Sequence, residues 1–385
     1  MGSGIYYFNP TAEMAVANGI FSYQPPALLQ SFERDMASIM LYFAGKSDVV
    51  LIHQHPKESF LDKIRSIKPD LPEFMTMNEL IDSGRKFDEL VPWGWSPVVY
   101  KTLESVFPLL KNSFKQSIFY TWDQQYKTYY SRMTSAKVLE QICNESIRGV
   151  GEFALLKATQ CFSTSDVQYL LSENGKLVIK APFSSSGRGL QMLRRHNLNH
   201  SNIAWINSVL EKQEFVMAEN LHNKIADLSF HFKLKNNIEP EYLGTVYFDT
   251  NSNGQFSGCF LGNHPGNTIN KITELFIENG GIKIMAAAIR KYYKNYEGFL
   301  GVDAMIIEQS GHLLLHPCVE INPRFTMGLL TLQIRKHISS NGYWKMWFNK
   351  SGNLDTYFDK STVPLTPVFP GTKFAAVLDL TRKYV

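Results

Sequence analysis

The chain has 385 residues, of which 44% are hydrophobic and 19% are charged. This composition is typical of a folded protein with two or three lobes and excludes a disordered chain. The net charge of +4 is too small to indicate nucleic-acid binding, and no apolar stretch approaches the ~18 residues of a membrane-spanning helix.

The cysteines and the N-terminus indicate a cytoplasmic protein. Cys143, Cys161, Cys259 and Cys318 form no CxxC pair, which favours reduced thiols. Residues 1–10 lack the basic and long apolar regions of a signal peptide.

The first 90 residues alternate between strand and helix patterns. Residues 5–10 and 48–55 are predicted strands, and residues 25–45 and 57–67 are predicted helices. This alternation predicts a small parallel sheet.

Two polar or aromatic motifs of this region stand out. Asn9, Glu13 and Asn18 follow the first strand, and we interpret them as turn and cap residues. Trp93 and Trp95 flank a glycine just before a predicted helix. We interpret this motif as a hydrophobic hinge rather than a ligand site.

The middle of the chain is predicted to be helical over residues 103–160, with a helix start at Ser131 or Thr134. The region from about 150 to 218 then has the pattern of a compact α+β unit with a glycine-bearing hairpin. Its predicted strands are 176–183, 190–195 and 214–220, with a helix over 203–213.

Lys180 lies in the first strand of that hairpin. Alternation puts Leu177, Ile179 and Ala181 on one face and Lys180 on the other, where its ammonium group needs an anion. The loop Ser184–Gly189 has small residues whose backbone N–H groups can approach phosphate oxygens. A flexible turn is the alternative for the loop alone, and GxxxxGK[ST] is absent, so the P-loop interpretation fails.

The last part of the chain begins with antiparallel strands over 226–237 and 239–250 and a loop over 251–270. A helix over 281–296 and a hairpin over 302–323 follow. Between the strand ending at Glu219 and Asp227 we expect a connector that could meet an adenine edge, with the Asp227 carboxylate on the ribose. A plain linker is the alternative.

The hairpin carries a predicted metal site. A turn at Ser310 and Gly311 would place Asp303 opposite Cys318, on the same face as Glu320 and Asn322. Asp303 and Glu320 would then be diagonal neighbours, roughly 7–8 Å apart at the backbone. Two carboxylates and an amide oxygen suit Mg²⁺. A salt-bridged strand end is the alternative.

These parts, in this order, resemble the ATP-grasp superfamily of ATP-dependent carboxylate–amine ligases. The resemblance covers roughly Arg132 to Leu330, and its most specific element is an Asp, a hairpin and then Glu-x-Asn. It also extends to uncharacterised bacterial proteins with an ATP-grasp domain. It implies that Lys180 holds the nucleotide phosphates and that Arg324 faces the transferred phosphoryl group.

The resemblance also implies roles for other residues. Arg132 would match an arginine near the start of the family region, and Asp227 would hold the ribose. The phosphate loop would comprise Ser184, Ser185, Ser186, Gly187 and Gly189, and the adenine contacts Glu219, Asn220 and Leu221. Asp303, Glu320 and Asn322 would hold one or two Mg²⁺ ions.

The chain departs from the family pattern in two places. Members often carry Arg or Lys shortly before the metal Asp, where this chain has Leu300, Gly301 and Val302. The ribose residue is Asp rather than Glu. Lys233, His231 and Arg290 are candidates for the missing cation.

The expected fold is therefore an ATP-grasp fold, with a small parallel α/β N-terminal lobe followed by two α+β lobes. The expected divisions are 1–130, 131–218 and 219–385. The expected reaction joins a small-molecule carboxylate to an amine at the expense of ATP, with no nucleic-acid or membrane partner, and a homodimer is left open. A kinase or a non-catalytic nucleotide-binding protein are the alternatives.

Overall fold

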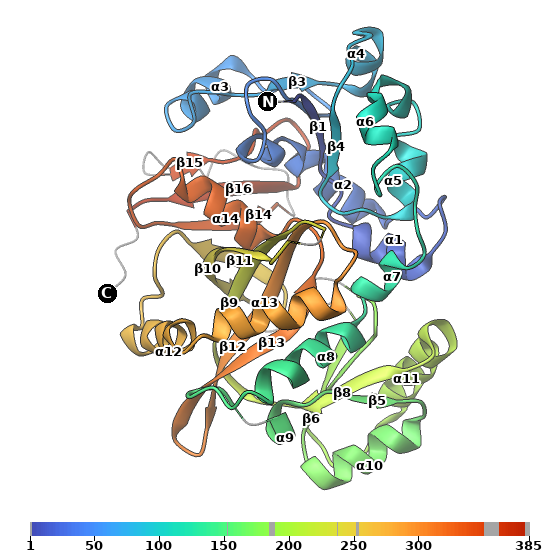
Figure 1. Ribbon diagram of the computed structural model, residues 1–385, viewed down its shortest axis with the longest axis vertical. Coiled ribbons are helices and arrows are strands. Elements are labelled where there is room, and N and C mark those ends of the chain that lie inside the picture. The colour runs from blue at the N-terminus through green and yellow to red at the C-terminus, as the bar shows by residue number, and fades with distance from the viewer. Residues whose placement is uncertain are drawn as a thin grey trace. The chain divides into compact units, whose positions relative to one another are not determined.

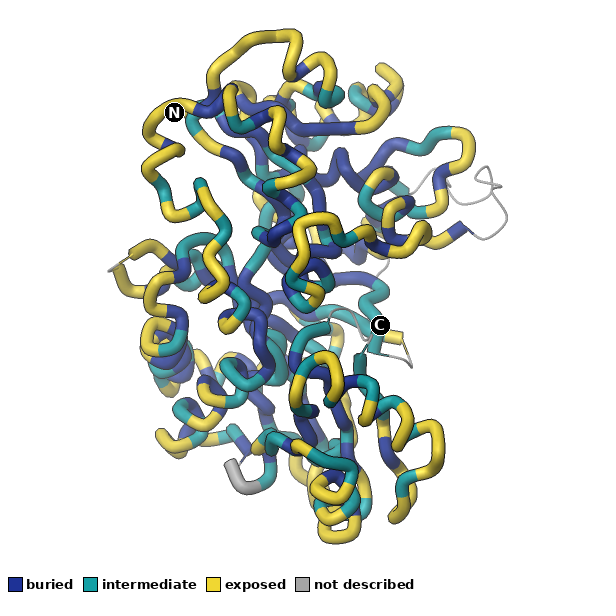
Figure 2. The backbone as a smooth tube through the Cα atoms, turned by 90° about the vertical axis from the view of Figure 1, so that its right-hand side faces the viewer, coloured by how far each residue is buried: buried dark blue, intermediate teal, exposed yellow. Residues whose placement is uncertain are grey.

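The computed structural model describes residues 2–151, 153–184, 189–236, 238–251, 254–349 and 362–381. The chain forms two compact units. Unit 1 comprises Met1–Asp123, Ser257–Asn263 and Arg324–Val385, and unit 2 comprises Gln124–Phe256 and His264–Pro323. Each has buried segments beneath exposed connections (Figure 2). No helix within the described ranges is long and apolar enough to cross a membrane.

The predicted N-terminal parallel sheet is confirmed in unit 1 (Figure 1). Its strand order is β3-β2-β1-β4, and all neighbours are parallel. The strands are β1 (Gly4–Tyr7), β2 (Val49–Leu51), β3 (Glu73–Met75) and β4 (Glu89–Pro92). Ile5 and Val49 are fully buried, and β2 (VVL) is buried throughout, which explains its continuous apolar sequence.

Helices connect these strands. The predicted helix over 25–45 divides into an α-helix and a 3₁₀-helix. Thr76 and Glu79 form a capping box that fixes the start of α4. The helices are α1 (Ala12–Asn18), α2 (Ala27–Met36), η1 (Ala37–Tyr42), α3 (Glu58–Arg65), α4 (Met77–Asp82), α5 (Pro97–Thr102), η2 (Phe107–Leu109) and α6 (Asn112–Lys115).

Unit 1 also contains an antiparallel ladder that the sequence did not predict, in the order β11-β14-β16-β15. Its elements are β11 (Phe256–Phe260), β14 (Tyr343–Phe348), β15 (Thr362–Pro364) and β16 (Phe374–Asp379), with helix α14 (Met327–Arg335). The predicted loop over 251–270 is therefore wrong, because β11 lies inside it. Cys259 and Phe260 are buried there, and the burial of their apolar side chains stabilises this short strand.

The smaller sheet of unit 2 has the order β5-β8-β6-β7 and is antiparallel. Its elements are β5 (Thr159–Cys161), β6 (Leu177–Lys180), β7 (Leu190–Leu193) and β8 (Val216–Asn220), with helices α10 (Thr164–Asn174) and α11 (His200–Gln213). Both helices begin with capping boxes. Leu177, Ile179 and Ala181 are buried in the core of this α+β lobe, as predicted.

The larger sheet of unit 2 carries the strands β13-β12-β9-β10 in that order, all antiparallel. These are β9 (Asn223–Leu234), β10 (Glu241–Thr250), β12 (Gly298–Gln309) and β13 (His312–Asn322). Helices α7 (Tyr126–Tyr129), α8 (Arg132–Cys143), α9 (Phe153–Leu156), α12 (Asn267–Glu278) and α13 (Gly281–Tyr292) complete the unit. The predicted fold class, a parallel α/β lobe followed by antiparallel α+β parts, is confirmed. The predicted divisions after residues 130 and 218 stay predictions.

The two faces of β9 differ sharply. Leu228, Phe230 and Phe232 are fully buried on one face, and Phe230 packs against Phe276 of α12. The opposite face carries polar side chains, which gives the strand a period of two. This polar face contains the candidate site.

Candidate functional site

The β12–β13 hairpin carries the three predicted metal ligands. The pairing follows the predicted turn as far as Met305 opposite His316. Beyond that pair the register shifts, and Asp303 lies directly opposite Glu320. The predicted pairing of Asp303 with Cys318 is wrong. The two carboxylates are direct cross-strand neighbours, closer together than the predicted diagonal arrangement.

The shift has a local cause in Pro317. Residues 317–319 of β13 stand against Ala304 alone. Proline has no N–H to give to the ladder, so it is found in strands at bulges or edges. A shift of two residues preserves the side-chain alternation, whereas a shift of one would reverse it. Asp303 and Glu320 therefore still share one face.

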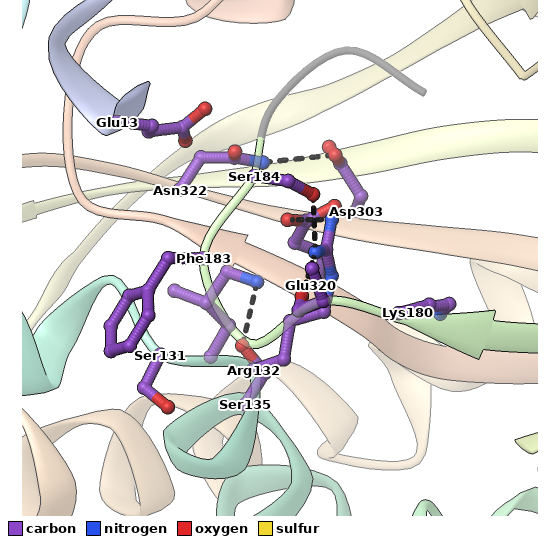
Figure 3. A network of polar contacts seen from close by, with 12 residues as sticks. Glu13, Ser131, Arg132, Ser135, Lys180, Phe183, Ser184, Asp303, Glu320 and Asn322 are labelled. Atoms are coloured by element: carbon purple, nitrogen blue, oxygen red, sulfur yellow. Dashed lines mark hydrogen bonds and ion pairs between the residues drawn. The ribbon is translucent and has the colours of Figure 1, made fainter. Parts of the chain in front are cut away.

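All three predicted metal ligands are hydrogen-bonded (Figure 3). The Asn322 amide Nδ2 donates to Asp303 Oδ2 over 2.9 Å. The Arg132 guanidinium lies 2.7 Å from Glu320 Oε1, with side-chain exposures of 5% and 24%. The structure thus brings Asp303, Glu320 and Asn322 together and adds Arg132 to them.

Arg132 connects the metal hairpin to the loop after β6. It is the first residue of α8, and the Ser131 hydroxyl accepts from the Met133 N–H at the helix start. Its Nη1 donates to the Ala181 carbonyl at 2.5 Å and to Ser184 Oγ at 2.6 Å. Arg132 Nε is buried without a hydrogen-bond partner.

Helix α8 is anchored to β13, which fixes where Arg132 lies. The Ile321 N–H donates to the Ser135 hydroxyl over 3.0 Å. Cys318 Sγ donates to the Ser135 carbonyl, and burial raises the pKa of the Cys318 thiol well above its usual value. Cys318 is therefore a neutral packing residue.

Lys180 has the anion that its buried position requires. Its Nζ lies 2.6 Å from Glu219 Oε2, and the two side chains are 9% and 11% exposed. Val178 pairs with Glu219 and Lys180 with Met217, so Lys180 and Glu219 are diagonal neighbours on β6 and β8. In this state the predicted adenine residue Glu219 holds Lys180.

The polar face of the larger sheet is organised in three rungs. Each rung has a residue of β12 in the middle, paired on one side with a residue of β9 and on the other with a residue of β13. Successive rungs are two residues, about 7 Å, apart along β9 and β12, whereas on β13 the bulge separates His316 from Glu320 by four residues. The rungs are Asp227–Met305–His316, Ser229–Asp303–Glu320 and His231–Gly301–Asn322.

Of the three candidates for the missing cation, His231 carries no charge in this state, and the role of all three stays a prediction. Burial lowers the pKa of His231 to about 3, and its Nε2 bonds to Ser229 Oγ at 2.9 Å. His231 is therefore a neutral imidazole. Arg290 is exposed and pairs with Glu239, whereas Lys233 lies over the Phe299 ring.

The glycine-rich loop is described only at its ends. Ser184 accepts from Arg132, and Gly189 has a positive φ of 85°. A Cβ at position 189 would meet Ser184 Cβ at 2.6 Å, so Gly189 and Ser184 approach closely only because residue 189 is a glycine. Ser185, Ser186 and Gly187 lie outside the described residues.

The connector after β8 is shorter than expected, because β9 begins at Asn223. The Asn220 amide donates to the Leu155 carbonyl, and the Leu221 N–H donates to the Lys176 carbonyl. Asp227 is a residue of β9, where its Oδ2 lies 2.5 Å from Lys224 Nζ and accepts from Thr250 Oγ1 at 2.8 Å.

Two histidines near Lys180 have ring nitrogens without a hydrogen-bond partner. His316 Nδ1 and His222 Nε2 are both buried and unbonded, and the rings meet edge to face at 5.9 Å. Burial lowers the pKa of both imidazoles, and the positive charge of Lys180 acts on both in the same direction. Buried polar atoms without partners are uncommon and point to a ligand or to water.

Solved structures with the same architecture exist. The biotin carboxylase domain of 2-oxoglutarate carboxylase from Hydrogenobacter thermophilus, solved with MgADP and bicarbonate, matches 99% of this chain and 86% of its own, with 11% identity and a TM-score of 0.54. Biotin carboxylase from Campylobacter jejuni matches 98% and 87%, with 11% identity and a TM-score of 0.52.

A third match is N5-carboxyaminoimidazole ribonucleotide synthetase from Thermus thermophilus, over 99% of this chain and 94% of that one, with 12% identity and a TM-score of 0.50. No family model and no curated protein matches the sequence. The chain has the ATP-grasp fold.

The oxygen donors of the polar face fit Mg²⁺. Among the described residues no three His, Cys, Asp or Glu side chains are grouped as a metal site. In an ATP-grasp fold, Asp303 and Glu320 with Asn322 could therefore supply only part of an octahedral shell. Mg²⁺ prefers such sites, because it keeps waters and shares its coordination with phosphate oxygens.

The unbonded nitrogens fit a nucleotide. Arg132 Nε, His222 Nε2 and His316 Nδ1 are buried without partners; the two histidines lie near Lys180, and Arg132 pairs with Glu320. A nucleotide has both phosphate oxygens and a base with donor and acceptor atoms, so it could use all three.

Arg324 begins the last segment of unit 1. Its Nε lies 2.9 Å from Glu13 Oε1, and its Nη1 donates to the Phe325 carbonyl at 2.9 Å. Only Pro323 separates it from Asn322 along the chain, so its Cα stays within about 7 Å of the Asn322 Cα.

Several residues of this arrangement were missed from the sequence. Ser229 and His316 are single polar residues in apolar strands, and only a correct strand register places them opposite Asp227, Asp303 or Glu320. A period-two analysis of 227–233 would have put Ser229 and His231 on the Asp227 face. His222 carries no comparable signal.

Proposed function

We propose that this chain is an ATP- and Mg²⁺-dependent ligase that joins a carboxylate to an amine through an acyl phosphate and releases ADP and phosphate. The main support is the pairing of Asp303 with Glu320 on a polar face next to buried Lys180, within an ATP-grasp fold. Catalysis of this kind depends mainly on positioning of the reacting groups and on neutralisation of the phosphate charge.

The proposed binding roles are assigned by the positions of the residues in the three rungs and around them. Asp303, Glu320 and Asn322 would hold the metal, which would neutralise phosphate charge. Lys180 exchanges its Glu219 partner for nucleotide phosphates, and Arg132 and the loop from Ser184 to Gly189 contact phosphate oxygens. The base lies at the rung of Asp227 and His316, near Glu219–Leu221, with Asp227 on the ribose.

In the proposed reaction the substrate carboxylate oxygen attacks the ATP γ-phosphorus and ADP leaves. Arg324 carries charge on the transferred phosphoryl group, for which a planar guanidinium is suited. The amine nitrogen then attacks the acyl carbon, phosphate leaves, and the amine loses a proton. Closure of the 131–218 lobe over the site would exclude water, which otherwise hydrolyses the acyl phosphate.

The experiment is a comparison of melting temperatures with no ligand, with ATP and Mg²⁺, and with ATP and a chelator. Ligand at about 100 times its Kd adds about 2.7 kcal/mol, which raises the melting temperature by several degrees. A rise that needs both ATP and Mg²⁺ supports the proposal, and no rise at millimolar ATP contradicts it. A phosphorylated product formed without an amine would indicate a kinase instead.

A further inference from the structure

Two sequence motifs of unit 1 have no role in the reaction as proposed so far. Residues 8–13 (FNPTAE) follow β1, and residues 92–95 (PWGW) begin with Pro92, the last residue of β4. The strands β1 and β4 are parallel neighbours, with Tyr7 opposite Pro92, so both motifs lie at the carboxyl edge of the sheet. In the order β3-β2-β1-β4 this is where the connections diverge, the place where open α/β sheets carry their functional loops.

Asn9 joins the two motifs. Its Nδ2 donates to the Gly94 carbonyl at 2.7 Å, and the Gly94 N–H donates to its Oδ1 at 3.2 Å. Asn9 is 6% exposed, so this double hydrogen bond is shielded from water. The backbone of the second motif is thereby held in one position relative to the first.

Because Gly94 has no side chain, Ala12 and Arg324 can both lie close to its backbone. A Cβ at position 94 would lie 2.7 Å from Ala12 Cβ and 3.4 Å from Arg324 Cβ. The first distance is shorter than real Cβ contacts allow, so only glycine fits without a shift. The Phe325 N–H donates to the Trp93 carbonyl at 2.9 Å, which fixes the backbone next to Arg324.

Glu13 completes this arrangement at the guanidinium itself. Its Oε1 lies 2.9 Å from Arg324 Nε, and Arg324 Nη1 donates to the Phe325 carbonyl at 2.9 Å. Contacts at two nitrogens of a planar group fix its plane. The side chains of Arg324 and Glu13 are 13% and 7% exposed, so their pairing is little screened by solvent.

We propose that Glu13 is a positioning residue for Arg324, and that Asn9 and Gly94 form the frame that holds the pair. This inference rests on the proposed function, in which Arg324 contacts the transferred phosphoryl group. Charge stabilisation of a transition state depends on donors that are already in place, and a displacement of about 1 Å can cost about 100-fold in rate. The alternative is a buried ion pair that serves stability alone.

The test compares the affinity for MgADP with the affinity for MgADP plus aluminium fluoride, a mimic of the transferred phosphoryl group. Glu13→Gln removes the charge of Glu13 and keeps its shape. We expect its MgADP affinity to stay within about twofold of wild type. The aluminium fluoride gain, which is the factor by which aluminium fluoride increases the affinity for MgADP, should fall about tenfold. A tenfold change is the size expected for the loss of one charge-assisted hydrogen bond. The matched control is Glu73→Gln, which removes an exposed pair with Arg85 in the same unit and should change neither affinity.

A double-mutant cycle with Arg324→Lys separates positioning from stability. If Glu13 acts through Arg324, the double variant loses no more of the aluminium fluoride gain than Arg324→Lys alone. Additive losses, or a full gain in Glu13→Gln, would overturn the inference. Gly94→Ala should reduce the same gain, whereas Gly45→Ala, whose added Cβ would meet only Asp48 Oδ2 at 3.5 Å, should not.

A second measurement covers the case in which the wild type binds neither nucleotide probe, which would contradict the proposed function itself. The ¹⁵N–H signal of Arg324 Nε, identified by its loss in Arg324→Lys, should exchange slowly with water in wild type and faster in Glu13→Gln. Equal exchange rates would overturn the positioning role, independently of any activity.

Discussion

Asp303 and Glu320 lie directly opposite each other across β12 and β13, and each carboxylate has its own partner. Asn322 donates to Asp303, and Arg132 pairs with Glu320. Two like charges directly opposite each other destabilise an antiparallel pair. The partners therefore offset a repulsion that the fold would otherwise avoid, and a bound cation would offset it further.

The first prediction concerns Asp303→Asn. It removes one of two opposed charges and keeps a side chain that can bond to Asn322. We expect the free energy of unfolding without ligand to stay constant or rise by up to about 1 kcal/mol, because a repulsion is lost. The rise in melting temperature with ATP and Mg²⁺ should disappear.

Urea denaturation and melting curves with and without MgATP check this prediction. The control is Glu241→Gln, an exposed position on β10 of the same unit. A variant that is clearly less stable without ligand, yet keeps its MgATP response, would show that Asp303 serves the fold and not a metal.

The second prediction concerns Arg132→Lys. Lysine keeps the charge but cannot reach Glu320, Ala181 and Ser184 from one planar group. We expect a loss of about 1.5–3 kcal/mol in the free energy of unfolding, since hydrogen bonds to a buried charge are broken. The measurement is urea denaturation, and Arg290→Lys, at an exposed pair with Glu239, should change stability by less than about 1 kcal/mol. Equal effects of the two substitutions would contradict the prediction.

The fold could be predicted from the sequence where local patterns suffice. Strand and helix alternation predicted the parallel sheet of β1–β4, and period-two alternation predicted the buried face of β6. The β11–β14–β16–β15 ladder pairs segments far apart in the chain, and a single short apolar run does not reveal its partner.

In the candidate site, too, features set by local patterns could be predicted from the sequence, and features set by long-range contacts could not. The shared face of Asp303 and Glu320 could be predicted, because a bulge that shifts the register by two residues leaves faces unchanged. Their direct opposition could not, because it depends on how the chain accommodates Pro317. The pairing of Arg324 with Glu13 joins residues from opposite ends of the sequence, and no local pattern specifies it.

The third prediction concerns pH. His231 is neutral in the folded chain because burial lowers its pKa from 6.5 to about 3. The unfolded chain binds a proton near pH 6.5, so the stability that His231 contributes is complete above that pH and is lost as pH falls towards 3. The loss amounts to about 1.4 kcal/mol per pH unit once the unfolded imidazole is protonated.

His231→Gln tests this assignment. Below about pH 6, the slope of the unfolding free energy against pH should be smaller than in wild type by about 1.4 kcal/mol per pH unit, which corresponds to one proton fewer taken up on unfolding. Above pH 7.5 the two curves should run parallel, whatever the packing cost of the substitution. An unchanged slope below pH 6 would mean that His231 is not the group that titrates on unfolding.

The fourth prediction concerns His316, whose buried Nδ1 has no partner. A buried polar atom without a hydrogen bond costs about 1–3 kcal/mol, so a residue kept for the fold alone should be replaceable by an apolar one. We expect His316→Leu to be as stable as wild type or more stable without ligand, and to bind MgATP less tightly. The position of His316, one rung from the two carboxylates, favours a contact with the base rather than with the phosphates.

Inorganic tripolyphosphate separates those two contacts. With Mg²⁺, His316→Leu should bind tripolyphosphate as wild type does and lose affinity only for ATP, as measured by calorimetry. His312→Leu, at an exposed position near the turn of the same hairpin, is the control and should bind both as wild type does. If His316→Leu loses affinity for both ligands alike, His316 acts at the phosphates. If it binds both normally and is less stable, the unbonded nitrogen belongs to the packing of β13 and not to a ligand site.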